Sequence, residues 1–191
     1  MLATLDHLAP GRVILGAGVG WMREEIELFG VPHARRGAWT DEAIAIMRAC
    51  WREDRVSFRG EFFSFEDVGC RPRPANGAIP IWIGGHTDRA LARVATLGDG
   101  WHAAFPTPKA LGDGIVRLRA ACAKVGRDPA TLSISARLGL SAKRPAADLL
   151  SELRALRDLG VAHVILETQM RDVAEMTATY ERFATHVRAH L

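Results

Sequence analysis

Arg12-Val-Ile-Leu-Gly-Ala-Gly-Val-Gly-Trp21 joins an apolar strand to three alternating glycines, and the acidic first turn of a predicted helix follows. Glycine at positions 16, 18 and 20 removes Cβ atoms from one edge of the strand end, which permits positive φ angles and close approach of a flat or anionic group. The GxGxG spacing lacks the last glycine of the dinucleotide-binding fingerprint GxGxxG. A second apolar strand ends in Gly84-Gly85, and a third glycine turn covers residues 98–101. These three turns predict strand ends that face a ligand.

Composition limits the class of protein. The chain has 191 residues, 48% of them apolar, which is enough for one core, so we expect a single domain spanning residues 1–191. The net charge of +3 comes from interspersed acidic and basic residues, so a nucleic-acid partner is not expected. The sequence shows no secretory leader and no apolar run near the ~20 residues that span a bilayer. Cys50, Cys70 and Cys122 lie in no metal-ligand pattern. We therefore expect a cytoplasmic protein with reduced thiols, no membrane partner and no metal site.

Strands and helices alternate along the chain. Residues 2–9 are predicted to be the end of a helix, and the helix at residues 40–51 has Thr40 or Asp41 as its predicted N-cap. Residues 56–65 alternate about Arg59-Gly60, which predicts a β-hairpin outside the main sheet. The predicted strands are residues 13–16, 79–83, 100–104, 132–138 and 162–166, and the other helices are residues 24–29, 88–97, 108 to about 126, 147–159 and 173–190.

This alternation indicates an α/β fold. Strands that are apolar on both faces, each followed by an amphipathic helix, predict a parallel sheet with right-handed crossovers. The five βα units form either an open doubly wound sheet or part of a (β/α)8 barrel, which typically needs about 250 residues.

The motifs together resemble the luciferase-like monooxygenase family, and within it the branch of oxidoreductases that depend on coenzyme F420. The resemblance implies a partial (β/α)8 TIM barrel of five units, equivalent to strands four to eight, with the hairpin as an excursion. It implies F420 as the cofactor, with FMN as the alternative. The first three βα units, which form one wall of the family's substrate pocket, have no counterpart here. The matching segments, in the family's order, are residues 2–8, 11–21, 29–32, 36–42, Trp51 with 56–60, Pro80-Ile-Trp-Ile-Gly-Gly85 and Leu97-Gly-Asp-Gly-Trp101.

The predicted cofactor site is the turn between the strand at 79–83 and the next helix. Free N–H groups and the positive end of the helix dipole favour a phosphate there. The alternative is that this turn and its N-cap are only structural, and that the first glycine run only packs closely against a neighbour. The resemblance favours binding, so the cofactor-binding candidates are Gly18, Gly20, Gly84, Gly85, His86 and Thr87.

Five further residues are candidates for catalysis and for the substrate pocket. By resemblance, Trp21 forms the substrate side of the pocket, and Trp101 is assigned to the same pocket, with core filling as the alternative for both. His102 is the candidate for proton transfer because imidazole exchanges protons near neutral pH, although a structural hydrogen bond is the alternative. Arg137 and Glu167 lie in or at the ends of the last two strands, where a buried charge requires a partner or a ligand. We expect both to line the pocket.

The predicted function is hydride transfer between F420 and a small organic substrate. In such enzymes the cofactor carries the redox chemistry, and the protein supplies positioning and excludes water. The sequence contains no GxSxG, HExxH or Walker A motif. An FMN-dependent monooxygenase is one alternative, and a non-catalytic truncated remnant or assembly piece is another. Exposed strand edges also predict a homo-oligomer.

Overall fold

A five-stranded parallel sheet is the centre of the computed structural model, which describes all of residues 1–191. The strand order is β1-β4-β5-β6-β7, and every neighbouring pair is parallel. This topology confirms the predicted α/β fold with five successive βα units. The strands are β1 (Leu15–Ala17), β4 (Ile81–Gly84), β5 (Gly100–Ala104), β6 (Ser133–Gly139) and β7 (His163–Glu167).

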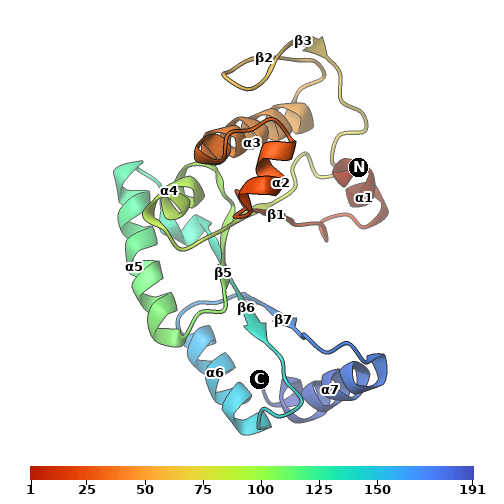
Figure 1. Cartoon of the computed structure of the whole chain (residues 1–191), viewed down its shortest axis with the longest axis vertical. Coiled ribbons are helices and arrows are strands. Elements are labelled where there is room, and N and C mark those ends of the chain that lie inside the picture. The colour runs from red at the N-terminus through yellow and green to blue at the C-terminus, as the bar shows by residue number, and fades with distance from the viewer.

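Helices connect successive strands and cover one side of the sheet. Figure 1 shows α4, α5 and α6 following one another along that side, with α1 and α7 at the two ends of the arc. Three short 3-10 turns, His33–Arg35, Pro129–Thr131 and Arg188–His190, complete the structure. The helices are α1 (Leu2–Leu8), α2 (Arg23–Leu28), α3 (Arg36–Arg52), α4 (Asp88–Leu97), α5 (Pro108–Lys124), α6 (Ala146–Asp158) and α7 (Val173–His186).

Alternate residues of each strand face the helices and form the core. In β4 and β5 these are Ile81, Ile83, Trp101 and Ala103, all of them buried. The intervening residues share the opposite side of the sheet, which we call the inner face. The strand register places on it Gly16, Trp82, Gly84, Gly100, His102, Ala104, Ser133, Ser135, Arg137, Gly139, His163, Ile165 and Glu167.

The sheet is strongly curved. The ring centroids of Trp82 in β4 and His163 in β7 lie 5.0 Å apart, although β5 and β6 separate the two strands. In a flat sheet three strand spacings would amount to about 14 Å. The two rings can therefore meet only if the sheet curls toward its inner face, as the wall of a barrel does.

The inner face of β6 is polar. Ser133, Ser135 and Arg137 alternate there with the apolar residues that face the helices. The prediction that all the strands are apolar on both faces is therefore wrong for β6, because this side of the sheet is not covered by helices.

Helix α3 begins four residues before the predicted N-cap Thr40. The 3-10 turn that starts at His33 runs directly into the helix. The Thr40 hydroxyl donates to the carbonyl of Arg36 at 2.9 Å, and the Asp41 carboxylate pairs with Arg93 of α4. The N-cap prediction is wrong because both polar side chains have partners within or beside the helix.

The predicted hairpin forms a separate two-stranded sheet of β2 (Val56–Arg59) and β3 (Ser64–Val68). Its turn covers residues 60–63 and is held by Glu42 of α3. The Glu42 carboxylate accepts hydrogen bonds from the N–H groups of Glu61, Phe62 and Phe63, at 2.6, 3.0 and 3.2 Å. The hairpin is thereby fixed to α3, away from the parallel strands.

The three cysteines are free thiols. None of the helices combines the length and the apolar character that crossing a bilayer requires.

Candidate functional site

The junction of β4 and α4 is built to expose backbone N–H groups. Gly85 has a φ of +118°, and a Cβ atom there would lie 2.7 Å from the Cβ of Ala90, so the position requires glycine. Thr87 is the N-cap, and its Oγ1 accepts a hydrogen bond from the N–H of Ala90 at 3.2 Å. The N–H groups of Gly85, His86 and Thr87 donate to no acceptor within the chain. These donors lie at the positive end of α4, where an anionic group is favoured.

Two side chains hold this junction in place. The indole N–H of Trp101 donates to the carbonyl of Gly85 at 2.8 Å. The Arg117 guanidinium of α5 donates to the carbonyl of His86 at 3.0 Å and pairs with the Asp88 carboxylate at 2.6 Å. Because Asp88 would repel an anion at the start of α4, its pairing with Arg117 offsets that repulsion.

The end of β1 lies beside this junction. A Cβ atom on Gly84 would lie 3.8 Å from the carbonyl oxygen of Ala17. A Cβ atom on Gly16 or Gly18 would meet nothing within 4 Å, so these glycines do not pack closely against a neighbour. Gly20 differs, because its φ is +75° and its Cβ would lie 3.2 Å from Ile26. Gly16 and Gly18 therefore leave open space next to the β4–α4 junction.

The two tryptophans assigned to the pocket lie in different environments. Trp21 is 79% exposed, which excludes core filling. Trp101 is 2% exposed, and a Cβ atom on Gly114 of α5 would overlap its ring. The structure places Trp101 in the core because odd-numbered residues of β5 face the helices. Its link to the site is the hydrogen bond to Gly85.

Three polar side chains form a row across the inner face. Nδ1 of His102 in β5 lies 3.0 Å from Oγ of Ser135 in β6, and the same Oγ lies 3.3 Å from Nδ1 of His163 in β7. Burial lowers the pKa of His102 from its ordinary value, and the charges of Arg137 and His163 lower it further. His102 is therefore held in its neutral form at neutral pH.

An ion pair lies beyond this row, toward the C-terminal ends of the strands. Nε of Arg137 and Oε2 of Glu167 are 3.2 Å apart, and both atoms are buried without a hydrogen bond. The guanidinium carbon of Arg137 lies 4.7 Å from the ring centroid of Phe105, which follows β5 with a φ of +50°. A non-glycine residue in this left-handed conformation is uncommon and indicates local strain.

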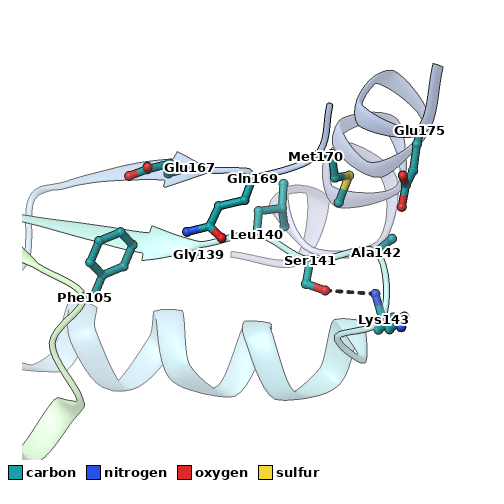
Figure 2. Close-up of a pocket in the computed structure, with 10 residues that line it drawn as sticks. All are labelled: Phe105, Gly139, Leu140, Ser141, Ala142, Lys143, Glu167, Gln169, Met170 and Glu175. Atoms are coloured by element: carbon teal, nitrogen blue, oxygen red, sulfur yellow. Dashed lines mark hydrogen bonds between the residues drawn. The ribbon is translucent and has the colours of Figure 1, made fainter. Parts of the chain in front are cut away.

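A cavity of about 490 Å³ opens at the C-terminal ends of β5, β6 and β7. This is the edge of the sheet at which (β/α)8 barrels carry their active sites. Figure 2 shows Phe105, Glu167 and Gln169 at one end of the cavity and Lys143 and Glu175 at the other. The lining therefore combines an aromatic ring with charged and amide groups.

The structure brings some of the sequence candidates together and leaves others apart. Gly84 and His102 are paired in the register of β4 and β5, Gly18 directly follows β1, and Arg137 and Glu167 form an ion pair. Of the candidates for catalysis and the substrate pocket, only Glu167 lines the cavity. No group of three or more His, Cys, Asp or Glu side chains could hold a metal ion.

Ser135, His163 and Phe105 belong to this part of the structure but were not among the residues predicted from the sequence. The signal for Ser135 was present as the polar alternation of residues 133, 135 and 137. Assigning it to a site required the strand register, which only the structure gives.

Comparison with known proteins extends over almost the whole chain. The model of the luciferase-like monooxygenase family matches residues 1–189. An uncharacterized protein of Mycobacterium tuberculosis is 32% identical over 188 residues, which are 96% of this chain and 62% of the relative. The FMNH(2)-dependent dimethylsulfone monooxygenase of Pseudomonas putida is 27% identical over 158 residues, which are 81% of this chain and 42% of that enzyme. The chain thus spans less than two thirds of the length of these relatives.

The fold has a close counterpart among solved structures. An F420-dependent secondary alcohol dehydrogenase, in complex with an F420-acetone adduct, aligns with a TM-score of 0.83 at 18% identity. The alignment covers 98% of this chain and 72% of that chain. This similarity confirms the architecture as a partial (β/α)8 barrel of five parallel strands with a β-hairpin.

Proposed function

Because the chain belongs to the luciferase-like monooxygenase family of flavin- or deazaflavin-dependent oxidoreductases, we propose that it binds coenzyme F420 and supports hydride transfer between F420 and a small organic substrate. The bound cofactor would supply the two-electron chemistry, and the protein would supply binding, orientation and exclusion of water. FMN is the second candidate, because the Pseudomonas putida relative is named as FMNH(2)-dependent.

The β4–α4 junction is the observation that carries this proposal. Three N–H groups without an acceptor in the chain directly precede α4, and the junction requires a glycine with positive φ. Such a junction suits the phosphate of either cofactor. The open space over Gly16 and Gly18 leaves room for a flat ring system beside the phosphate.

The substrate belongs in the cavity at the ends of β5, β6 and β7. His102 lies next to Gly84 in the register, so it stands between the glycine junction and the ion pair of Arg137 and Glu167. A neutral imidazole in that position can exchange a proton with the substrate while hydride passes to or from the cofactor. We assign His102 to proton transfer and Arg137, Glu167 and Trp21 to the substrate side.

Fluorescence titration of the purified chain with F420, and separately with FMN, tests the proposal. Gly18→Asp would place a carboxylate in open space beside the junction, so we expect it to weaken cofactor binding at least tenfold by repelling the phosphate without unfolding the chain. Gly69→Asp is the matched control, because it adds the same charge at an exposed position near the hairpin with ordinary Cβ contacts. We expect it to bind as the wild type does.

Saturable binding of F420 that Gly18→Asp weakens would support both the cofactor and its position. Tighter binding of FMN than of F420 would favour the second candidate. If the folded chain binds neither cofactor, the proposal is wrong and the non-catalytic alternative gains weight.

We also propose that the chain self-associates through its sheet. Strands β1 and β7 each have a neighbour on one side only. Unpaired strand edges are templates for pairing with another chain. Light scattering tests this proposal, and a monodisperse monomer would contradict it.

A further inference from the structure

Ser135 lies at the centre of a polar row on the inner face. Its side chain is fully buried, and its Oγ contacts Nδ1 of His102 on one side and Nδ1 of His163 on the other, at 3.0 and 3.3 Å. The three residues come from adjacent strands and are paired in the strand register. No other side-chain hydrogen bond is formed by any of the three.

A hydroxyl group between two ring nitrogens restricts where protons can be. Serine has one hydrogen to donate and accepts through its oxygen, whereas each neutral imidazole carries its hydrogen on only one of its two nitrogens. If both Nδ1 atoms were bare, one of them would lose its partner. If both carried hydrogen, the buried Ser135 hydroxyl hydrogen would have no acceptor, which is costly. Both contacts are satisfied only when one Nδ1 donates and the other accepts.

We infer that Ser135 couples His102 and His163, holding them in opposite tautomers and letting them exchange tautomers when a proton passes through its hydroxyl. In one state His102 carries its hydrogen on Nε2 and His163 carries its hydrogen on Nδ1. In the other state the two assignments are reversed. Ser135 is thus a positioning residue that acts through both histidines.

The exchange takes up one proton and releases one proton. When Nε2 of His102 gains a proton, Nδ1 of His102 passes its hydrogen to Oγ of Ser135. The hydroxyl hydrogen of Ser135 moves to Nδ1 of His163, and Nε2 of His163 releases a proton to water. Each atom ends with an ordinary valence, and one proton has crossed from His102 to His163. His163 is exposed on the inner face, so water can take up that proton.

This exchange indicates the substrate class, a step that rests on the proposed function. In one state Nε2 of His102 is a hydrogen-bond donor, and in the other it is an acceptor. An alcohol that loses hydride must lose its hydroxyl proton to a base, and a carbonyl that gains hydride must receive a proton from an acid. A relay with both states suits a substrate that interconverts between an alcohol and a carbonyl compound.

Charges near His102 favour the neutral states on which the coupling depends. The groups that face it are Arg137 on β6 and His163 on β7. Both disfavour a positive charge on His102, and burial acts in the same direction. The coupling therefore holds above the ordinary pKa of histidine, about 6.5, and is lost in acid when the His102 ring becomes cationic.

The test is long-range ¹H–¹⁵N NMR of the ¹⁵N-labelled chain without cofactor, well above that pKa. The nitrogen shifts report how much hydrogen each of Nδ1 and Nε2 carries. We expect complementary values, so that the Nδ1-protonated fractions of His102 and His163 sum to about one, as the single hydroxyl hydrogen requires. Two histidines in the same tautomer would overturn the inference.

Variants of β6 separate coupling from simple hydrogen bonding. Ser135→Ala removes the hydroxyl, and we expect the histidine that carries its hydrogen on Nδ1 to move toward the Nε2-protonated form that isolated imidazole prefers, so that the two Nδ1-protonated fractions sum to well below one. Ser135→Thr keeps a hydroxyl and should restore the complementary values. Ser133→Ala, two residues earlier on the same face, is the matched control and should change neither ring. Unchanged tautomers in Ser135→Ala would contradict the coupling.

The experiment is independent of the proposed function because it needs neither cofactor nor substrate. Complementary tautomers with no cofactor binding would keep the relay and reject the redox role. Cofactor binding with identical tautomers would keep the redox role and reject the relay.

Discussion

Two strand-to-helix junctions of the sheet have the same length and the same cap but leave different groups free. Residues 85–87 join β4 to α4, and residues 105–107 join β5 to α5. Each begins with a residue of positive φ, +118° at Gly85 and +50° at Phe105. Each ends with a threonine N-cap whose Oγ1 accepts a hydrogen bond at 3.2 Å from the third residue of the helix.

The difference lies in the backbone donors. In the β5–α5 junction the N–H of Phe105 donates to the carbonyl of Arg137 at 2.7 Å, Pro106 has no N–H, and only the N–H of Thr107 has no acceptor within the chain. In the β4–α4 junction three successive N–H groups have no acceptor within the chain. One junction therefore offers its backbone to a ligand, whereas the other offers the Phe105 ring to Arg137 and to the cavity. Two junctions of the same length and with the same N-cap can therefore present either backbone or side-chain groups. The choice depends on the first two residues, which are Gly85-His86 in one junction and Phe105-Pro106 in the other.

Trp101→Ala should have the largest effect, because Trp101 lies on β5 and supports the β4 junction. The mutation empties a fully packed site against α5 and removes the hydrogen bond to Gly85. We expect a loss of about 3–5 kcal/mol in the free energy of unfolding. Urea denaturation measures it, with Trp21→Ala as the exposed control that should change stability by less than about 0.5 kcal/mol. Equal losses in the two variants would contradict the core position of Trp101.

Substitution at the first position of each junction should affect stability unequally. Gly85→Ala forces a Cβ atom into a positive φ and against Ala90, so we expect a loss of about 1–3 kcal/mol. Phe105→Gly loses the stack on Arg137 but relieves left-handed strain, and the two effects offset each other. We expect its cost to stay below about 1 kcal/mol. Both variants are measured in the same denaturation series. A larger loss in the free energy of unfolding for Phe105→Gly than for Gly85→Ala would contradict this expectation.

The two caps form a matched pair. Thr87→Ala and Thr107→Ala each remove one N-cap hydrogen bond of the same length, and we expect each to lower stability by about 1 kcal/mol. Only Thr87→Ala also removes a hydroxyl donor next to the free N–H groups, so only this variant should weaken F420 or FMN binding in the fluorescence titration. Equal weakening by Thr107→Ala would show that cap loss acts through helix stability and not through contact with the cofactor.

Local signals were sufficient to predict the β4–α4 junction and the parallel sheet. Gly84-Gly85 and Thr87 are glycine and capping signals that act over a few residues, so the sequence indicates both the turn and the helix start at Asp88. The regular alternation of strands and helices predicts a parallel sheet but leaves the strand order open between a doubly wound sheet and a partial barrel, and the family resemblance favoured the barrel. The start of α3 was misplaced because Thr40 is a good N-cap by type but found a partner inside the helix.

The polar row could not be predicted, because it depends on register and curvature. His102, Ser135 and His163 are separated by 33 and 28 residues, and they meet only because three strands align at one level. Trp101 was assigned to the pocket for the same reason, since a shift of one residue along β5 exchanges the inner face for the core. Periodicity in a short strand shows that two faces differ, but the covering helices decide which face is buried.

The smallest expected effect concerns Arg137, whose guanidinium lies over the ring of Phe105 in the β5–α5 junction and whose charge acts on His102. Arg137 is one cause of the lowered pKa of His102, after burial, so Arg137→Gln should raise that pKa toward its ordinary value. Because the folded pKa is lowered, the unfolded chain takes up the proton first as the pH falls below about 6.5, and stability declines in that window. Arg137→Gln should therefore narrow the pH range over which stability falls and reduce the loss in the free energy of unfolding.

NMR titration of His102 measures the change in its pKa. Arg144→Gln, which breaks a partly buried ion pair with Glu152 on α6, is the control that should leave this pKa unchanged. An unchanged His102 pKa in Arg137→Gln would mean that burial and His163 keep the imidazole neutral, and Arg137 would then act only through its ion pair with Glu167 and its contact with the Phe105 ring.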